Sequence, residues 1–300
     1  MGKSNSGQLR KGEATAGYLM ILPLFSGLIV FYLFAFAQNV YDSFTNKSSF
    51  GVPDFIGLQN YIKLFKQPNF YTAFVNTLEY VLICVPFVVI FSVLIAVLLN
   101  YGIKGKGIYR TLAFLPAVTL PAGVALIWKW LLNYEFGLIN ALLNGLCISS
   151  VAWLSDPQVV LVAVSLVFIW SSVSYQVVIL LAGLQGISAN YYEAATIDGA
   201  NRWHQFLFIT LPLLSPSIFF VMLTSIINVF QIFDIIYLII PQYSSGTAAS
   251  RSLATYFFEE AFIKFQKGYG AAIAVILFLL IMVFTLIQLM VQKRWVHYDD

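Results

Sequence analysis

Four polar side chains recur along one long apolar stretch, and their chemistry is hydrogen bonding. They are Thr224, Asn228, Gln231 and Asp234, separated by four, three and three residues. On a helix that turns about 100° per residue, they fall within an arc of roughly 120°. This stripe either lines a pathway that offers hydrogen bonds to hydroxyl groups or bridges neighbouring helices. Asp234, near the outer end, also fits a structural or gating role.

A second group combines aromatic and polar side chains in an earlier apolar stretch. It contains Trp170, Ser174, Tyr175 and Gln176. Aromatic faces stack well on sugar rings, although an aromatic residue in an apolar helix more often packs against its neighbours. No arginine lies deep in any apolar stretch, where a carrier of phosphates or carboxylates would be expected to place one. These features favour a neutral, hydroxyl-rich solute.

The residues that could make or break bonds lack the spacing that catalysis requires. The sequence has neither H-E-x-x-H nor G-x-S-x-G, the patterns of metalloproteases and serine hydrolases. The closest approach to a phosphate-binding loop is YGIKGKGIYRT, whose glycines and lysines are in the wrong order. Cys84, Cys147, His204 and His297 show no ligand-like spacing. The sequence therefore predicts no catalytic residue, no metal site and no enzymatic activity in this chain.

The composition places the chain in a membrane. Of its 300 residues, 60% are hydrophobic and 10% are charged, and the mean hydropathy is +0.85. A soluble domain carries about 25% charged residues and cannot hide this much apolar surface. The net charge of +3 and the lack of a basic block argue against a nucleic-acid partner. The lipid bilayer is therefore the first expected partner.

Six stretches are long enough for an apolar helix of about 20 residues to cross a bilayer. They are 17–42, 73–100, 111–132, 158–185, 211–240 and 270–292. The sequence thus predicts an all-α polytopic membrane protein, with a six-helix domain over 17–292 and short tails at 1–16 and 293–300. Amphipathic patterns at 57–70 and 253–269 predict short interfacial helices.

Lysine and arginine near the ends of the spans predict the orientation. With the N-terminus inside, nine of the 16 lie in inner segments and seven in outer segments. The inner segments are the shorter ones, so their positive charge is denser. We therefore expect both termini on the cytoplasmic side of the membrane.

A polar insert at 187–212 separates the fourth and fifth spans. Ser188 can cap a helix because its hydroxyl can accept a free backbone N–H. Tyr191 to Ile197 favours helix, and Asp198-Gly199 stops it, since glycine tolerates the left-handed conformation. A second short helix is expected from about Asn201. The pattern predicts two short helices at an angle, which suits docking of another protein better than an ordinary loop.

The surroundings of this insert carry further expectations. Pro212 and Pro216 are expected at the mouth of the fifth span, since proline is tolerated in a first turn. Tyr192, Trp203 and Phe206 are expected to anchor the insert to the span ends. A small surface that a partner can approach closely is formed by Ala194, Ala195 and Ala200.

The insert resembles the EAA loop of ABC importer permeases. That pattern runs Glu-Ala-Ala, two residues, Asp-Gly-Ala, then a phenylalanine and two prolines. It is met here by Glu193, Ala194, Ala195, Asp198, Gly199, Ala200, Phe206, Pro212 and Pro216. Other stretches look like the sugar-permease branch, namely FIGLQNYIKLF, ALIWKWLLN, FGLIN, LAGLQGIS, FQIFDIIYLI and FFEEAFIKFQKGYGAA. The resemblance thus extends over nearly the whole chain.

The resemblance implies a transport subunit of the bacterial inner membrane that works by alternating access. Residues Tyr192 to Ala200 would form a coupling helix that docks on a cytoplasmic ABC ATPase dimer. That dimer would bind ATP and Mg²⁺, and this chain would hold no cofactor. A second, similar permease and an extracytoplasmic solute-binding protein would complete the importer. One segment departs from the family: IPQYSSGTAAS stands where a glycine-rich stretch is common.

Three alternatives stay open on the residues. The same architecture could carry a polyol phosphate, such as a glycerol phosphate, instead of a mono- or oligosaccharide. A membrane sensor or assembly scaffold would use the insert to bind a partner other than an ATPase. A membrane enzyme is the third, and it lacks a catalytic constellation.

Overall fold

The computed structural model describes residues 5–48, 51–101, 105–241 and 244–296. Parts of both expected tails, 1–4 and 297–300, lie outside these residues, as do 242–243 in the segment that departs from the family. All regular elements of the described residues are helical. The chain divides into two compact units, one of residues 1–64 and 260–275 and the other of residues 65–259 and 276–300.

The first unit contains the N-terminal span. Helix α1 (Asn5–Leu28), the π-helical η1 (Ile29–Phe34) and α2 (Ala35–Asp42) follow without a break, so the helix begins inside the expected tail. The stretch Ala16–Asp42 is long and apolar enough to cross a membrane.

The remainder of the first unit is held by backbone and amide hydrogen bonds. Helix α3 (Gln59–Leu64) confirms the short helix expected within 57–70. Its buried Asn60 donates to the carbonyls of Ser43 and Thr45, each at 2.8 Å. At the start of α15 (Lys267–Gln292), Gly268 donates to the carbonyl of Lys47 at 2.8 Å. A Cβ on Gly268 would clash with the Thr45 carbonyl oxygen, so this contact needs glycine.

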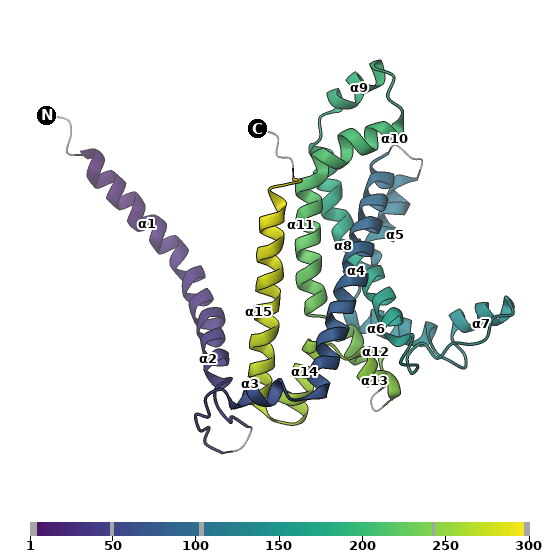
Figure 1. The fold of residues 1–300 in the computed structure, drawn as a ribbon. Helices are drawn as coiled ribbons and strands as arrows, with labels where there is room; N and C mark the ends of the chain where they lie inside the picture. Colours follow the sequence, from purple (N-terminus) through teal and green to yellow (C-terminus); the bar gives the residue numbers. More distant parts are fainter. Residues whose placement is uncertain (1–4, 49–50, 102–104, 242–243, 297–300) are drawn as a thin grey trace. The chain divides into compact units, whose positions relative to one another are not determined.

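The second unit is built on three long helices that pack side by side, α4 (Pro68–Asn100), α8 (Val160–Gly186) and α11 (Leu211–Phe230). Their apolar side chains form most of its two buried clusters. In Figure 1, helices α9 (Ala189–Ile197) and α10 (Arg202–Gln205) lie at one end of this group, on the same side as the C-terminal end of α15. Helices α12 (Asp234–Ile239) and α13 (Ser245–Ser250) lie at the opposite end. Two of the inner segments expected from the sequence, the insert and the end of the last span, are thus at one end of this unit.

The expectation of a single helix over 111–132 was wrong. Helices α5 (Lys106–Val118) and α6 (Pro121–Leu131) replace it, and they are bent by 102° at a short break. Pro121 causes the break, because it lacks an N–H and forces Leu120 before it into an extended conformation. The described residues therefore contain five helices fit to cross a membrane, or six if the bent pair is counted as one span.

The expected span 211–240 was wrong at both ends. The continuous helix runs over Arg202–Phe230, and Gln231 ends it. Helix α12 then begins at Asp234, whose carboxylate suits the positive end of a helix dipole. The aromatic rings of Phe233, Tyr237 and Phe258 pack against one another at this break, with centroids 4.8 to 5.2 Å apart. The other three expected spans lie in helices α4, α8 and α15, with shifts of a few residues at their ends.

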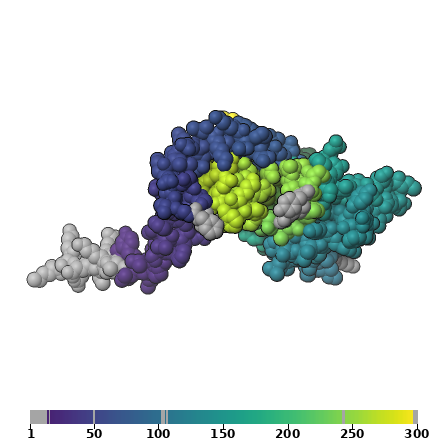
Figure 2. Space-filling model, turned by 90° about the horizontal axis from the view of Figure 1, so that it is seen from below, coloured from purple at the N-terminus to yellow at the C-terminus, as the bar shows by residue number. Residues whose placement is uncertain are grey.

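Two smaller helices complete the second unit. Helix α7 (Leu138–Gly145) projects from it in Figures 1 and 2. The buried Asn140 holds this hairpin, since its amide donates to the carbonyls of Tyr134 and Val151 and accepts from the Trp153 indole at 2.9 Å. Helix α14 (Leu253–Phe258) and the π-helical η3 (Glu259–Ile263) confirm helix within 253–269.

Helices α8 and α11 approach each other at Gly183, and this contact yields a test of the packing. A Cβ there would lie 2.9 Å from both Leu214 Cδ1 and Ser217 Cβ. We expect Gly183→Ala to cost about 1–3 kcal/mol by forcing the helices apart, and to lower the melting temperature in detergent. Gly186→Ala is the matched control, because nothing lies within 4 Å of its added Cβ. Equal melting temperatures for the two variants would contradict this packing.

Candidate functional site

The polar insert folds as a capped helix that ends in a left-handed glycine corner. The Ser188 hydroxyl accepts from the backbone N–H of Asn190 at 3.3 Å, which confirms the expected cap. At the other end Gly199 has a φ of +79°. The N–H of Ala200 donates to the Ala195 carbonyl at 2.8 Å, and the N–H of Gly199 donates to the Thr196 carbonyl at 3.1 Å. This pair of bonds is the Schellman motif, so glycine is required by conformation.

The helix after the corner is part of the fifth span and not a separate piece. The Asn201 side chain caps α10 by accepting from the His204 N–H at 2.9 Å. The chain continues through the π-helical η2 (Phe206–Thr210) directly into α11. Pro212 lies in the first turn of α11, as expected, whereas Pro216 lies inside this helix, so the expectation of a first-turn position was wrong for it. The π-helical turn lies just before Pro212, where proline cannot donate to the carbonyl four residues back.

Side-chain hydrogen bonds lock the two helices of the insert together. The Gln205 amide donates to the Thr196 hydroxyl at 3.0 Å and to the Ala200 carbonyl at 3.4 Å. The Tyr192 hydroxyl lies 3.1 Å from the hydroxyl of the buried Thr210. The corner is therefore rigid and tied to the span. Sequence reasoning missed these bonds, because the partners lie 5 to 18 residues apart with no periodic pattern.

The outer surface of the insert is exposed and rich in small side chains. Glu193, Ala194 and Asp198 are exposed, and the large apolar Ile197 is 87% exposed beside them. Trp203 packs on Phe206 with ring centroids 5.6 Å apart but stays 64% exposed. Tyr192 and Phe206 fit the anchoring role expected of all three aromatic residues, and Trp203 does not. A surface of this composition can dock a protein but offers no constellation for catalysis.

The second candidate site is a cavity of about 400 Å³ in the second unit. One wall comes from the break between α5 and α6, and another from Tyr175 and Ser171 of α8. The third is the break between α11 and α12, which contributes Gln231 and Asp234, with Asn228 just before it. Of the described residues that line the cavity, Asp234 alone carries a charge. The arrangement can offer hydrogen bonds to a polar, uncharged solute.

The structure divides the two polar groups predicted from the sequence. Gln176 is buried and lies 3.5 Å from the Thr224 hydroxyl, so this pair joins α8 to α11 away from the cavity. Trp170 packs edge-on against Trp128 and lines a separate, apolar cavity of about 290 Å³. The single helical stripe from Thr224 to Asp234 was wrong, because the helix ends at Phe230. Gln176 and Thr224 thus bridge two helices, whereas Tyr175, Asn228, Gln231 and Asp234 line the cavity, and their place in a substrate pathway stays a prediction.

Sequence reasoning also missed Ser171 and the backbone of the two breaks as cavity walls. Ser171 could have been predicted because it is next to Trp170 and one helical turn from Tyr175 in the sequence. The breaks in the helices could not, because they depend on tertiary packing. Among the residues whose positions are given, no group of three or more His, Cys, Asp or Glu could hold a metal ion.

Comparisons with known proteins give consistent results. Residues 61–297 match the family described as "Binding-protein-dependent transport system inner membrane component". The trehalose/maltose transport system permease protein MalF of Thermococcus litoralis is 32% identical, over 98% of this chain and 99% of the relative. The sn-glycerol-3-phosphate transport system permease protein UgpA of Pectobacterium atrosepticum is 31% identical, over 94% and 95%.

A solved structure shares the fold. A chain of a bacterial alginate ABC transporter, crystallised in complex with an alginate pentasaccharide-bound periplasmic protein, superposes with a TM-score of 0.84. The two chains are 21% identical, and the match covers 94% of this chain and 96% of that one. This likeness supports the arrangement of helices described above.

The corner at Gly199 can be tested directly. We expect Gly199→Val to strain the insert by about 1–2 kcal/mol, because a side chain at this φ is penalised although nothing lies within 4 Å of the site. Hydrogen exchange at the amide of Ala200 should become faster, while the amount of protein in the membrane stays normal. Gly199→Asn is the control, since asparagine tolerates this conformation. Unchanged exchange in the valine variant would rule out a conformational role for this glycine.

Proposed function

This chain belongs to the family of binding-protein-dependent transport system inner membrane components, and on this premise we propose that it forms half of the pathway of an ATP-driven sugar importer. Permeases of this family carry solutes and leave the energy-releasing chemistry to other subunits. The proposed solute is a mono- or oligosaccharide, carried by alternating access. The observation that carries the proposal is the locked glycine corner that presents the motif residues Glu193 to Ala200 on an exposed surface.

The proposed role of this surface is to receive a push from an ATPase. A separate cytoplasmic ABC ATPase dimer would bind ATP and Mg²⁺ and dock on α9. Small side chains at Ala194, Ala195 and Ala200 would allow close approach, and the exposed Ile197 would supply apolar area. Because the corner bonds are satisfied within the insert, displacement of α9 would move α10 and the fifth span with it.

The cavity supports a neutral solute over a phosphate. A phosphate carries negative charge and binds best to arginine, lysine or clustered N–H groups. The Asp234 carboxylate would repel it, whereas carboxylates and amides such as those of Asp234, Asn228 and Gln231 bind sugar hydroxyls well. The name of the trehalose/maltose relative agrees with this choice, and the name of the glycerol-phosphate relative keeps the polyol phosphate as the alternative.

The proposed assembly has four further components. A second, similar permease would complete the pathway and cover apolar surface of this chain, two ATPase subunits would bind inside, and a solute-binding protein would dock outside. The insert, which lies at the same end of the second unit as the C-terminal end of α15, would face the cytoplasm. Both termini would be cytoplasmic in this arrangement.

Docking on α9 can be tested by placing a large side chain on its exposed surface. We expect Ala194→Trp to block close approach and to lower recovery of a P-loop ATPase at least tenfold when the chain is purified in mild detergent from its native membrane. Ala141→Trp, on the exposed part of α7, is the matched control and should leave recovery unchanged. The proteins that co-purify are identified by mass spectrometry.

Two results would count against the docking proposal. If the Ala194→Trp variant recovers as much ATPase as the control, α9 is not the docking surface. If even the unaltered chain brings down no ATPase after cross-linking, the sensor or scaffold alternative takes the place of the importer.

The solute is tested with the purified complex in vesicles, together with its binding protein. We expect uptake of labelled maltose or trehalose, and little uptake of sn-glycerol-3-phosphate. Asp234→Asn should raise the half-saturation concentration for the sugar about tenfold, since hydrogen bonds to charged groups contribute about 1.5–3 kcal/mol. Glu135→Gln, an exposed site outside the cavity, is the control. Preferential uptake of the phosphate would favour the alternative.

A further inference from the structure

The break between α11 and α12 leaves the backbone carbonyl of Ile232 outside both helices, so neither helix supplies its hydrogen-bond partner. Ile232 lies in this break and also lines the cavity, and with 3% of the residue exposed its backbone is buried. A buried carbonyl without a partner costs free energy comparable to a lost hydrogen bond. The Ser252 hydroxyl supplies the partner by donating to this oxygen at 2.7 Å. The neighbours of Ile232 on both sides, Gln231 and Phe233, line the cavity.

The donor is itself held in place. Ser252 is fully buried and caps α14. Its hydroxyl oxygen accepts from the backbone N–H of Thr255 at 3.1 Å, and its own N–H donates to the Thr255 hydroxyl at 2.8 Å. The Ser252 hydroxyl also lies 3.3 Å from the Thr255 hydroxyl, so the Ile232 carbonyl at 2.7 Å is the nearer of its two acceptors.

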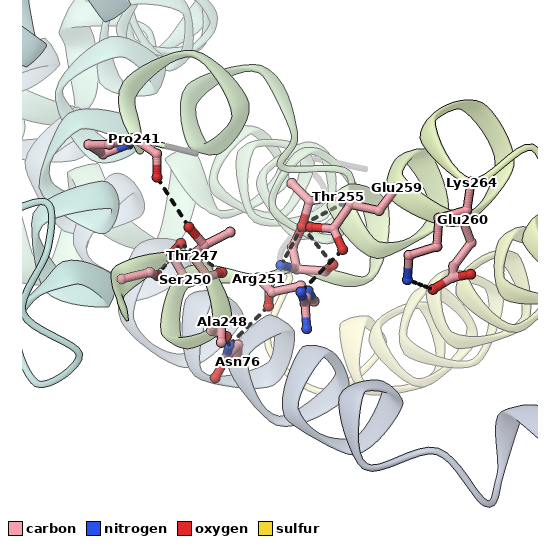
Figure 3. Close-up of polar contacts among 12 residues, drawn as sticks. Asn76, Pro241, Thr247, Ala248, Ser250, Arg251, Thr255, Glu259, Glu260 and Lys264 are labelled. Atoms are coloured by element: carbon pink, nitrogen blue, oxygen red, sulfur yellow. Dashed lines mark hydrogen bonds and ion pairs between the residues drawn. The ribbon is translucent and has the colours of Figure 1, made fainter. Parts of the chain in front are cut away.

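Helix α4 makes further hydrogen bonds to the segment around Ser252, residues 248–255. The Asn76 amide donates to the carbonyls of Arg251 and Ala248 at 3.0 and 3.3 Å, as Figure 3 shows. Thr77 accepts from the Leu253 N–H at 2.9 Å, and the Tyr80 hydroxyl donates to the Ser250 carbonyl at 3.0 Å. The three α4 residues are consecutive or one turn apart, so a single helix face makes all these bonds.

An ion pair closes the segment on its outer side. Arg251 lies 3.2 Å from the Glu259 carboxylate, and both side chains are mostly buried. The Arg251 guanidinium also lies over the Tyr256 ring at 5.8 Å. The segment 248–255 is therefore hydrogen-bonded both to α4 and to the break, and only its first three residues belong to the stretch IPQYSSGTAAS that departs from the family.

We infer that Ser252 is a positioning residue for the cavity, because it holds the Ile232 carbonyl and thereby sets the places of Gln231 and Asp234. The claim that Ser252 holds the break rests on the hydrogen bonds alone. The claim that this affects transport rests on the proposed function. Removal of the hydroxyl frees the break and also removes the side-chain cap of α14, while the bonds from α4 to the backbone of this segment do not depend on it.

The structural part is tested without any solute by thiol labelling of membrane vesicles. Cys147 is exposed and is first changed to serine, whereas the buried Cys84 stays. A cysteine is introduced by Ile235→Cys beside the break, or by Ser171→Cys on the α8 wall of the same cavity. Ser252→Ala should raise the labelling rate of the cysteine at position 235 about three- to tenfold. It should leave the labelling rate of the cysteine at position 171 unchanged.

Ser250→Ala is the matched control, because Ser250 is equally buried and its hydroxyl donates to a carbonyl of its own helix at 2.8 Å. It should change neither rate. Thr77→Val gives a second variant of nearly equal shape, and it should raise labelling at position 235 in the same direction. Equal labelling at position 235 for Ser252→Ala and Ser250→Ala would overturn the inference.

Uptake measurements separate this inference from the proposed function. In a complex active on maltose or trehalose, Ser252→Ala should raise the half-saturation concentration about three- to tenfold and change the maximal rate less than twofold. A lower maximal rate with an unchanged half-saturation concentration would contradict the positioning role. If no sugar is carried, the labelling result still decides whether Ser252 holds the break.

Discussion

Every polar backbone group that is buried in an apolar protein needs a partner, and the breaks in this chain depend on that constraint. A continuous helix satisfies its own backbone, so it can cross a membrane unaided. Each interruption exposes carbonyl and N–H groups that must be bonded by something else. Here Gly199 allows a left-handed turn whose backbone groups hydrogen-bond to the end of α9. The Ser252 hydroxyl donates a hydrogen bond to the carbonyl of Ile232. Two breaks also form most of the cavity, so the same constraint shapes both candidate sites.

The two sites are joined by one helix. It begins at Arg202, just after the glycine corner, and ends at Phe230, just before the cavity residue Gln231. At 29 residues it is about 43 Å long. In the proposed mechanism, the hydrogen-bonded corner at one end and the held break at the other would let a displacement of α9 reach the cavity as a movement of the whole helix. The proposed transport mechanism requires this connection, and neither the insert nor the cavity would supply it alone.

Much of this arrangement could be predicted from the sequence where the signal is local. Ser188, the helix after it and Gly199 were correct, because caps and left-handed glycines depend on neighbours within a few residues. The bend at Pro121 was missed although proline marks it, since the apolar run continues through it. The break after Phe230 carries no proline or glycine, and its partners are distant residues such as Ser252. The grouping of Asp234 with Tyr175 therefore required the structure, and the separation of Gln176 and Thr224 from the cavity did too.

The proposed function requires that α9 be the surface on which an ATPase drives this permease. An electron cryo-microscopy structure of the complex purified from native membranes tests this requirement. We expect Glu193, Ala194 and Ile197 to be buried in a groove of a P-loop ATPase, with the corner at Gly199 intact. An ATPase bound elsewhere, with α9 still exposed to solvent, would contradict the proposed function.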